Sequence, residues 1–360
     1  MYKRQTKDIS VIVQGAINKN ETIKCLQSIR QYLPGAEIIL STWEGSNITD
    51  LDYDNLILSK DPGAAIIEKS AQKVVYNNIN RQLLSTQAGL EKASRRYAMK
   101  VRSDLILTSD RFLDYFDKFQ ARTDNYTLFN RKIIVPALFT RFNIKCDNLY
   151  ERIKIPFHVS DWWLFGLRGD LNTYFCNTKL AEEPYFTEYF TKEENKHKNT
   201  PYGKTKFKFS PEQYFGYSCF ARNFKDIYME DAADYSDELM EKFRECLVNN
   251  FIVLEFAQSG IYLNKYPYSK NEKFSGDQYI GLYNFYRYEF EYKRICDKNY
   301  QMTSRRQKIF EDENFGYNLL RIYKHISKLL EPSANFLQKL EQIFIGIPFS
   351  LISFLFKYRK

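Results

Sequence analysis

The chain has 360 residues, of which 44% are hydrophobic, and no low-complexity stretch interrupts it. This length and composition are typical of a folded globular protein with a large core, and they exclude a disordered or fibrous chain. The net charge of +9 favours an anionic partner, such as a sugar nucleotide or a membrane surface. Because the basic residues are scattered and form no basic arm, we expect no nucleic-acid partner.

The cysteines and the first residues bear on the compartment. No two of the six cysteines have the spacing of a zinc site, and residues 1–10 contain no apolar core of a secretory signal. The sequence therefore predicts a cytoplasmic protein with reduced thiols.

In chain order, the first half of the sequence alternates predicted strands with predicted helices. Short apolar runs predict buried strands at residues 9–13, 36–43, within 54–63 and at 96–107. Apolar residues at helical spacing follow the first strand, with Asn20 as a candidate N-cap and Pro34-Gly35 as the stop. A second helical pattern covers residues 65–93. This alternation predicts an α/β fold with a parallel sheet covered by helices on both faces.

Polar clusters follow three of these strands at their carboxyl ends. They are Gln14-Gly15, Thr42-Trp43-Glu44 and Arg102-Ser103-Asp104. Since ligands of such sheets bind beyond the carboxyl ends of the strands, we expect the three clusters to converge on one crevice.

The second half mixes short strands and loops up to about residue 225, and helical patterns return from about 235. Residues 343–356 are apolar or small apart from two serines, and Lys357, Arg359 and Lys360 follow them. Fourteen helical residues span ~21 Å, which is too short for a hydrocarbon core of ~30 Å. The pattern predicts either an interfacial membrane anchor or a terminal helix docked on the core. The predicted units are an α/β domain at 1–230, a helical extension at 231–336 and an amphipathic tail at 337–360.

The Arg102-Ser103-Asp104 cluster has two interpretations. A strand-end aspartate in a nucleotide-sugar enzyme can hold Mn²⁺ or Mg²⁺, which neutralises the departing diphosphate. The usual pattern is Asp-x-Asp, and here Arg102 stands at the first position. Arg102 could itself bind a phosphate through two parallel hydrogen bonds, or the two side chains could form a structural ion pair.

Three other clusters each have a functional and a structural interpretation. Asn77, Arg81 and Ser85 recur at helical spacing with Asn78 beside them, so they suit a diphosphate or ribose, or simply a solvated helix face. Asp161 precedes two tryptophans, which fits either a sugar site with a general base or a tryptophan core patch with a turn. Glu212 follows Pro211 and is either a base or acceptor contact or the first turn of a helix.

Six segments together resemble the WavE family of lipopolysaccharide-synthesis proteins. They are "SVIVQGAI", "CLQSIRQYLPGAEIILSTWEGS", "LDYDNLILSKDPG", "NNINRQLLSTQAGLEKA", "YAMKVRSDLIL" and "PFHVSDWWLFGL". The similarity covers about residues 8–220, and the order and spacing of the segments make it specific. It implies a bacterial GT-A-like glycosyltransferase that acts in the assembly of surface polysaccharide.

The resemblance also implies roles for single residues. Those that would border the nucleotide or its diphosphate are Gln14, Gly15, Thr42, Glu44, Asn78, Arg81 and Arg102. Asp104 would bind the metal, while Asp161 and Glu212 would face the acceptor or act as base. Ala16 departs from the family pattern, which favours Pro after Gln-Gly.

The sequence thus predicts a GT-A-like nucleotide-sugar-binding fold with a largely helical C-terminal extension. Its reaction would move a sugar from a nucleotide-diphosphate donor to a lipid-linked glycan of lipopolysaccharide core, O-antigen or capsule. We expect it to lie peripherally on the cytoplasmic face of the inner membrane. Two alternatives stay open, a sugar- or polyol-phosphate transferase of capsule synthesis and a non-catalytic scaffold of the glycan-assembly complex.

Overall fold

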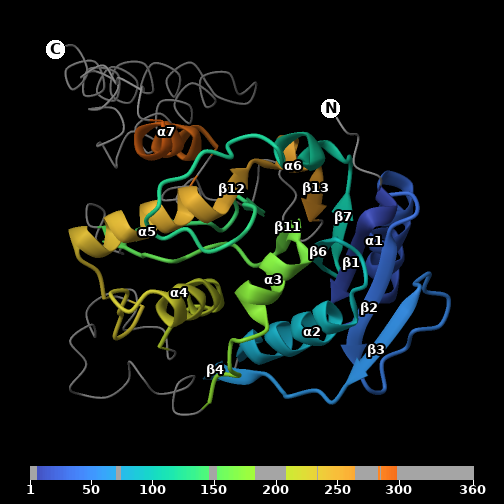
Figure 1. Cartoon of the computed structure of the whole chain (residues 1–360). Helices are drawn as coiled ribbons and strands as arrows, with labels where there is room; N and C mark the ends of the chain where they lie inside the picture. The colour runs from blue at the N-terminus through green and yellow to red at the C-terminus, as the bar shows by residue number, and fades with distance from the viewer. Residues whose placement is uncertain are drawn as a thin grey trace, which may run out of the picture.

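A seven-stranded sheet forms the centre of the protein (Figure 1). The structure is a computed structural model and describes residues 6–69, 74–145, 152–182, 208–232, 234–263, 283 and 285–297. The sheet has the order β12-β8-β11-β6-β1-β2-β3. Its strands are β1 (Ile9–Gln14), β2 (Glu37–Trp43), β3 (Asn55–Ser59), β6 (Tyr97–Arg102), β8 (Ile133–Pro136), β11 (Trp163–Leu167) and β12 (Phe251–Leu254). Only β11 runs antiparallel to its neighbours, so the α/β fold with a mostly parallel sheet is confirmed.

The first two helices begin at the carboxyl ends of strands. Helix α1 (Lys19–Tyr32) begins after Asn18, two residues before the predicted cap, and ends before Pro34-Gly35 as predicted. Helix α2 (Ile79–Lys92) packs against β1 and β2. A Cβ atom added to Gly89 of α2 would lie 2.3 Å from Cγ2 of Ile12, so only glycine allows this close approach of helix and strand.

The helix predicted over residues 65–93 is wrong in its first part. Two antiparallel strands, β4 (Ala65–Lys69) and β5 (Val74–Asn77), lie in that part, and α2 begins only at Ile79. The β-branched residues in both strands favour extended structure. The side chain of Asn77 accepts a hydrogen bond from the Ile79 backbone nitrogen at 3.0 Å, which fixes the start of the helix.

The strand predicted over residues 96–107 is two strands. β6 ends at Arg102, and β7 (Leu105–Leu107) pairs with β13 (Ile261–Leu263) in a separate small sheet. The break falls on Ser103 and Asp104, the polar residues that interrupt the apolar run.

The second half adds helices and the far edge of the sheet. The remaining elements are η1 (Thr6–Asp8), η2 (Arg111–Tyr115), β9 (Asn143–Lys145), β10 (Arg152–Lys154), α3 (Arg168–Phe175), α4 (Pro211–Asn223), α5 (Asp237–Asn250), α6 (Phe256–Ser259) and α7 (Phe285–Cys296). Strand β12 lies beyond residue 230, the predicted end of the α/β domain, and pairs with β8 in the central sheet. The predicted extension therefore contributes one strand, β12, to the central sheet.

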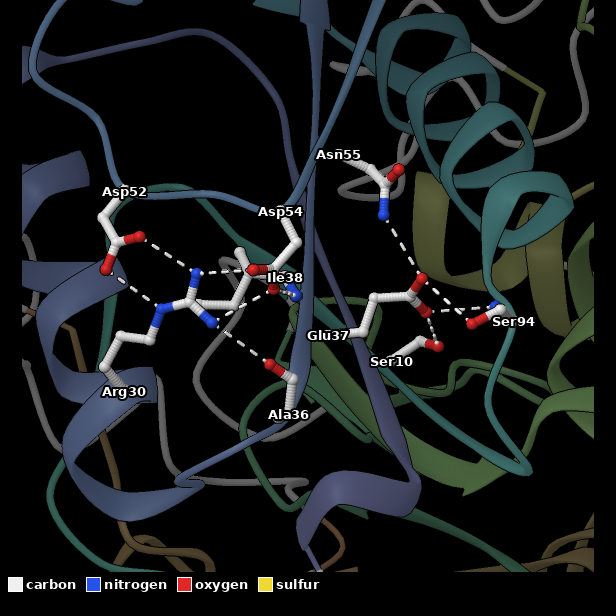
Figure 2. Close-up of polar contacts among 9 residues, drawn as sticks. All are labelled: Ser10, Arg30, Ala36, Glu37, Ile38, Asp52, Asp54, Asn55 and Ser94. Carbon is white, nitrogen blue, oxygen red and sulfur yellow. Dashed lines mark hydrogen bonds and ion pairs between the residues drawn. The ribbon is translucent and has the colours of Figure 1, made fainter.

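Figure 2 shows two carboxylate clusters that tie the sheet together. The guanidinium of Arg30 binds Asp52 and Asp54 through two hydrogen bonds each, and Asp54 also accepts from the Ile38 backbone nitrogen at 2.6 Å. Glu37 at the first position of β2 accepts hydrogen bonds from three side chains, those of Ser10, Asn55 and Ser94. Both clusters lie toward the amino ends of β1 and β2, so they do not occupy the carboxyl ends of these strands.

The predicted membrane tail, 337–360, lies outside the described residues. Among the residues that the structure describes, no helix combines the length and the hydropathy needed to cross a bilayer.

Candidate functional site

A pocket of about 600 Å³ lies at the carboxyl ends of β1, β2 and β6. Its lining residues come from these strand ends and from the starts of α1 and α2: Gln14, Gly15, Ala16, Ile17, Asn18, Glu21, Trp43, Asn78, Arg81, Gln82, Arg102, Ser103 and Asp104. Each of the three predicted polar clusters contributes at least one residue, so the predicted crevice is confirmed. It lies between β1 and β6, where the strand order reverses, and such switch points form clefts in parallel sheets.

The loop after β1 is fixed to both neighbouring strands. Gly15 has a φ of +113°, which a residue with a side chain rarely adopts, and its backbone nitrogen donates to Ser41 of β2 at 3.1 Å. On the other side, the Ser103 backbone nitrogen donates to Gln14 at 3.0 Å, and the Ser103 hydroxyl donates to the Ala16 carbonyl at 2.6 Å. This floor of the pocket is rigid.

Gln14 is held from the opposite side by α2. Its side-chain oxygen accepts a hydrogen bond from the Ser85 hydroxyl at 2.8 Å. Ser85 is fully buried, so it positions Gln14 instead of meeting a ligand. Asn77, predicted on the same helix face, precedes the helix, and its side chain accepts a hydrogen bond from the backbone nitrogen of Ile79, the first helical residue.

Two helices direct their amino ends at the pocket. Asn18 and Asn78 are the N-cap residues of α1 and α2, and both line it. Neither side chain makes a capping hydrogen bond to its own helix. The positive ends of the two helix dipoles favour an anion here.

Two arginines line the pocket, and a carboxylate orients each. Arg102 donates to both oxygens of Asp104, at 2.9 and 2.7 Å, and its guanidinium carbon lies 5.3 Å from the centroid of the Trp162 ring. Arg81 donates to both oxygens of Asp61, at 2.8 and 2.6 Å, and to Asn78 at 3.1 Å. The Arg81 guanidinium lowers the pKa of Asp61 below its usual range. The predicted Arg102–Asp104 ion pair therefore forms, and it faces the pocket.

Two buried oxygen atoms at the pocket have no hydrogen-bond partner in the described part of the chain. They are Oε2 of Glu21 and Oε1 of Gln82. A buried acceptor without a donor costs about 1–3 kcal/mol, so hydroxyl or N–H groups of a ligand would stabilise the site. Sequence reasoning missed both residues; the only signal was the position of Glu21 in the first turn of a helix that follows a strand end.

Two predicted nucleotide contacts, Thr42 and Glu44, do not line the pocket, and Trp43 between them does. Thr42 is buried with its hydroxyl 3.2 Å from that of Ser46, and Glu44 is exposed. Side chains alternate along a strand, so a pocket on one face receives the middle residue of the three.

The residues around Asp104 do not fit a divalent metal. Both of its oxygens accept from Arg102, so the guanidinium occupies the position that a cation would take. Within the described ranges, no group of three His, Cys, Asp or Glu residues is placed to hold a metal ion. Oxygen ligands of the kind that Mg²⁺ and Mn²⁺ require are therefore not assembled at this aspartate.

A second polar cluster lies beside the same end of β6. Trp163 of β11 pairs with Val101, which places the preceding Asp161 next to the end of β6. Asp161 is 2% exposed, and its Oδ2 atom lacks a hydrogen-bond partner among the described residues. Lys100, which is also buried, donates a hydrogen bond from Nζ to the Asp161 carbonyl.

Glu212 and His158 complete this cluster. Pro211 and Glu212 form the first turn of α4, capped by Ser210, so the structural interpretation of Pro-Glu is confirmed. His158 nevertheless faces the glutamate, with Nε2 3.8 Å from Oε2, while its Nδ1 lies 2.8 Å from the Phe139 carbonyl. The Glu212 side chain is 17% exposed, so solvent or a ligand can reach it.

Burial dominates the electrostatics of the cluster. Burial, and then the neighbouring Glu212, raise the pKa of Asp161 to about 6. Burial also raises the pKa of Glu212, and it lowers the pKa of Lys100 to about 8 and that of His158 to about 3. A carboxylate with a pKa near 6 is suited to accept a proton near neutral pH.

The two clusters are distinct but adjacent. Asp161 and Glu212 do not line the 600 Å³ pocket, whereas Arg102 does, and its charge acts on Asp161. Trp162, which follows Asp161, packs against the Arg102 guanidinium. A ligand in the pocket would thus have its charged end near Arg102 and a basic carboxylate beyond it.

Comparison with known proteins identifies the family of this chain. A family model described as WavE lipopolysaccharide synthesis matches residues 9–330, which include every strand of the sheet and every pocket residue. No curated protein matches the chain. Since the match covers most of its length, this protein belongs to the WavE lipopolysaccharide-synthesis family, which indicates a role in the synthesis of lipopolysaccharide.

Proposed function

We propose that this chain is a glycosyltransferase with a GT-A-like domain, which moves a sugar from a nucleotide-diphosphate donor to a glycan of lipopolysaccharide or capsule. The family supports a role in lipopolysaccharide synthesis, and the pocket supports the donor class. The observation that carries the proposal is the pocket at the β1/β6 switch point, lined by two arginines and two helix amino ends.

The sheet topology favours a nucleotide in this pocket. Numbered in chain order, its strands lie in the order 3-2-1-4-6-5-7, with the sixth strand antiparallel. The four strands in the order 3-2-1-4 have the same arrangement as in mononucleotide-binding folds. In those folds the ligand lies between strands 1 and 4. The sixth strand, β11, is antiparallel, so Asp161 and Trp162, which precede it, lie at the carboxyl end of β6. The acceptor would bind beside these two residues.

The lining residues match the parts of a nucleotide sugar. Arg81, Arg102 and the helix amino ends suit the diphosphate, and the partnerless oxygen of Glu21 suits a ribose hydroxyl. Trp43 offers an aromatic surface for the base or the sugar. The volume lies in the range of 300–1,000 Å³, roughly, that small-molecule sites occupy.

The buried carboxylates provide the base for an inverting transfer. The acceptor hydroxyl oxygen attacks the anomeric carbon, the bond from that carbon to the diphosphate oxygen breaks, and its electron pair leaves with the diphosphate. Asp161 takes the hydroxyl proton, with Glu212 as the second candidate. Arg81 and Arg102 stabilise the negative charge that develops on the leaving group.

The proposed acceptor is a lipid-linked glycan, and the proposed location is the inner membrane. A lipid-linked glycan requires the enzyme to work at the inner-membrane surface, and the cationic apolar tail 343–360 is suited to bind it from the cytoplasmic face. Deleting residues 343–360 should move the protein from the membrane to the soluble fraction. Unchanged fractionation would remove the tail from the proposal.

Thermal-shift screening with a panel of nucleotides and nucleotide sugars tests the proposal. A ligand at a hundredfold excess over its Kd stabilises the folded state by about 2.7 kcal/mol, so one nucleotide class should raise the Tm of wild type clearly. Gln14→Ala and Arg81→Met should reduce that shift, whereas Lys118→Met, which lies outside the pocket, should not. A folded sample that responds to no nucleotide would favour the scaffold function.

A further inference from the structure

The diphosphate of a donor carries charge that must be neutralised when it leaves. A hard divalent cation held by a strand-end aspartate is one solution. At the end of β6 that position is occupied by the Arg102 guanidinium, held on Asp104 by two hydrogen bonds. The chain thus places a guanidinium where such a cation would lie.

We propose that Arg102 and Arg81 together take the place of a divalent cation at the diphosphate, so that donor binding and sugar transfer need no metal. This inference rests on the proposed function and adds the means of leaving-group stabilisation. The bonds that form and break are those of the transfer described above, and the two guanidinium groups remain charged throughout.

Both arginines are held in place before a ligand arrives. Asp104 fixes one edge of the Arg102 guanidinium and Trp162 covers a face, while Asp61 and Asn78 fix Arg81. The Arg102 and Arg81 side chains are 25% and 35% exposed, so a ligand can reach them. Oriented donors of this kind stabilise a developing charge without reorganisation.

This arrangement assigns Asp104 as a positioning residue. Its two hydrogen bonds to Arg102 orient the guanidinium at the edge of the pocket. An oriented guanidinium binds phosphate oxygens with a planar geometry that an ammonium group does not reproduce.

Isothermal titration with UDP, GDP, ADP, CDP and TDP, each in EDTA and in MnCl₂, tests the inference. Wild type should bind one of them with affinities that agree within about twofold in the two buffers, because arginine contacts need no cation. Arg102→Met should weaken binding about tenfold or more in both buffers, the usual effect of losing a charge-assisted hydrogen bond. Arg102→Lys, which keeps the charge and loses the fork, should be intermediate.

Two further variants sharpen the test. Asp104→Asn should weaken binding less than Arg102→Met does, and equally in both buffers. Arg131→Met is the matched control, because Arg131 also pairs with an aspartate, Asp117 at 2.7 Å, but does not line the pocket. It should bind as wild type does, and melting curves show that each variant is folded.

The other outcomes overturn the inference in distinguishable ways. Binding that requires MnCl₂ and is abolished by Asp104→Asn would make Asp104 a metal ligand and leave the proposed function intact. Absence of binding by every nucleoside diphosphate in both buffers would reject the inference together with the proposed function.

Discussion

The pKa of Asp161 depends on its position just before β11. The residue is buried beside the end of β6, and its pKa is raised to about 6 by burial and by Glu212. As a base it must be ionised. Transfer should therefore be fastest above pH 6 and fall about tenfold for each pH unit below it. The pH dependence of kcat/KM measures this, and a rate that stays constant down to pH 4 would exclude Asp161 as the base.

A pair of variants separates the two candidate bases. Asp161→Asn should lower kcat by about 10²–10⁴-fold and remove the limb near pH 6, while nucleotide binding stays near the wild-type value. Glu212→Gln should keep most of the activity. The reverse result would make Glu212 the base.

Lys100 tunes this carboxylate from within the sheet. Its buried cation lowers the pKa of Asp161, an effect shared by Arg102 and His158 and opposed by Glu212. Replacing Lys100 with Met removes the charge and keeps the bulk, so the pKa of Asp161 should rise. The acid limb of the kcat/KM profile should then move to higher pH. A limb that stays in place would show that Lys100 only supports the backbone at Asp161.

The sequence predicted part of the pocket lining because strand ends can be read from apolar runs. Gln14, Arg102 and Asp104 were predicted from strand ends, and all three line the pocket. It chose Thr42 and Glu44 in place of Trp43, because the phase of side-chain alternation depends on how the strand is rotated in the sheet. Glu21 was missed because nothing local shows that its oxygen is buried without a partner.

At the level of elements, Glu37 links pieces of the chain that are far apart in sequence. It joins β1, β2 and β3 and the turn before β6, through Ser10, Asn55 and Ser94 (Figure 2). Glu37→Ala should lower the free energy of unfolding by about 1–3 kcal/mol, because it leaves several donors unpaired. Urea denaturation measures this, with exposed Glu91→Ala as the charge-matched control.

Glu37→Ala should affect the stability of the fold without affecting the nucleotide pocket. The Glu37 cluster lies toward the amino ends of the strands, so nucleotide affinity should be unchanged in folded Glu37→Ala protein. A loss of affinity without loss of stability would contradict this division of roles.

The paired strands β4 and β5 show why a continuous apolar pattern misleads. Ile66, Ile67, Val74 and Val75 satisfy a helical spacing and also the composition of strands. The antiparallel pairing of β4 with β5 stabilises the strands, and the spacing of apolar residues does not show this pairing.

For the molecule as a whole, the sheet is complete only with residues beyond 230. β12 pairs with β8, and the buried side chains of Met240, Phe243 and Leu247 in α5 belong to the core. A chain ending at residue 230 should therefore lack a cooperative thermal transition and aggregate, because it exposes the β8 edge and this core. A chain ending at residue 336 keeps every described element and is the control. A soluble, cooperatively melting 1–230 fragment would restore the domain boundary expected from the sequence.

Transfer of a sugar with release of a nucleoside diphosphate is the activity proposed for the whole molecule. The most direct test is chromatographic identification of the nucleotide product, after incubation with a nucleotide-sugar panel and lipid-linked glycan from a bacterial envelope. Glycosyl transfer predicts nucleoside diphosphate in equal amount to the sugar transferred, and about 10²–10⁴-fold slower product formation with Asp161→Asn. Release of nucleoside monophosphate, with a phosphate found between the sugar and the acceptor in the product, would contradict glycosyl transfer and identify a sugar-phosphate transferase.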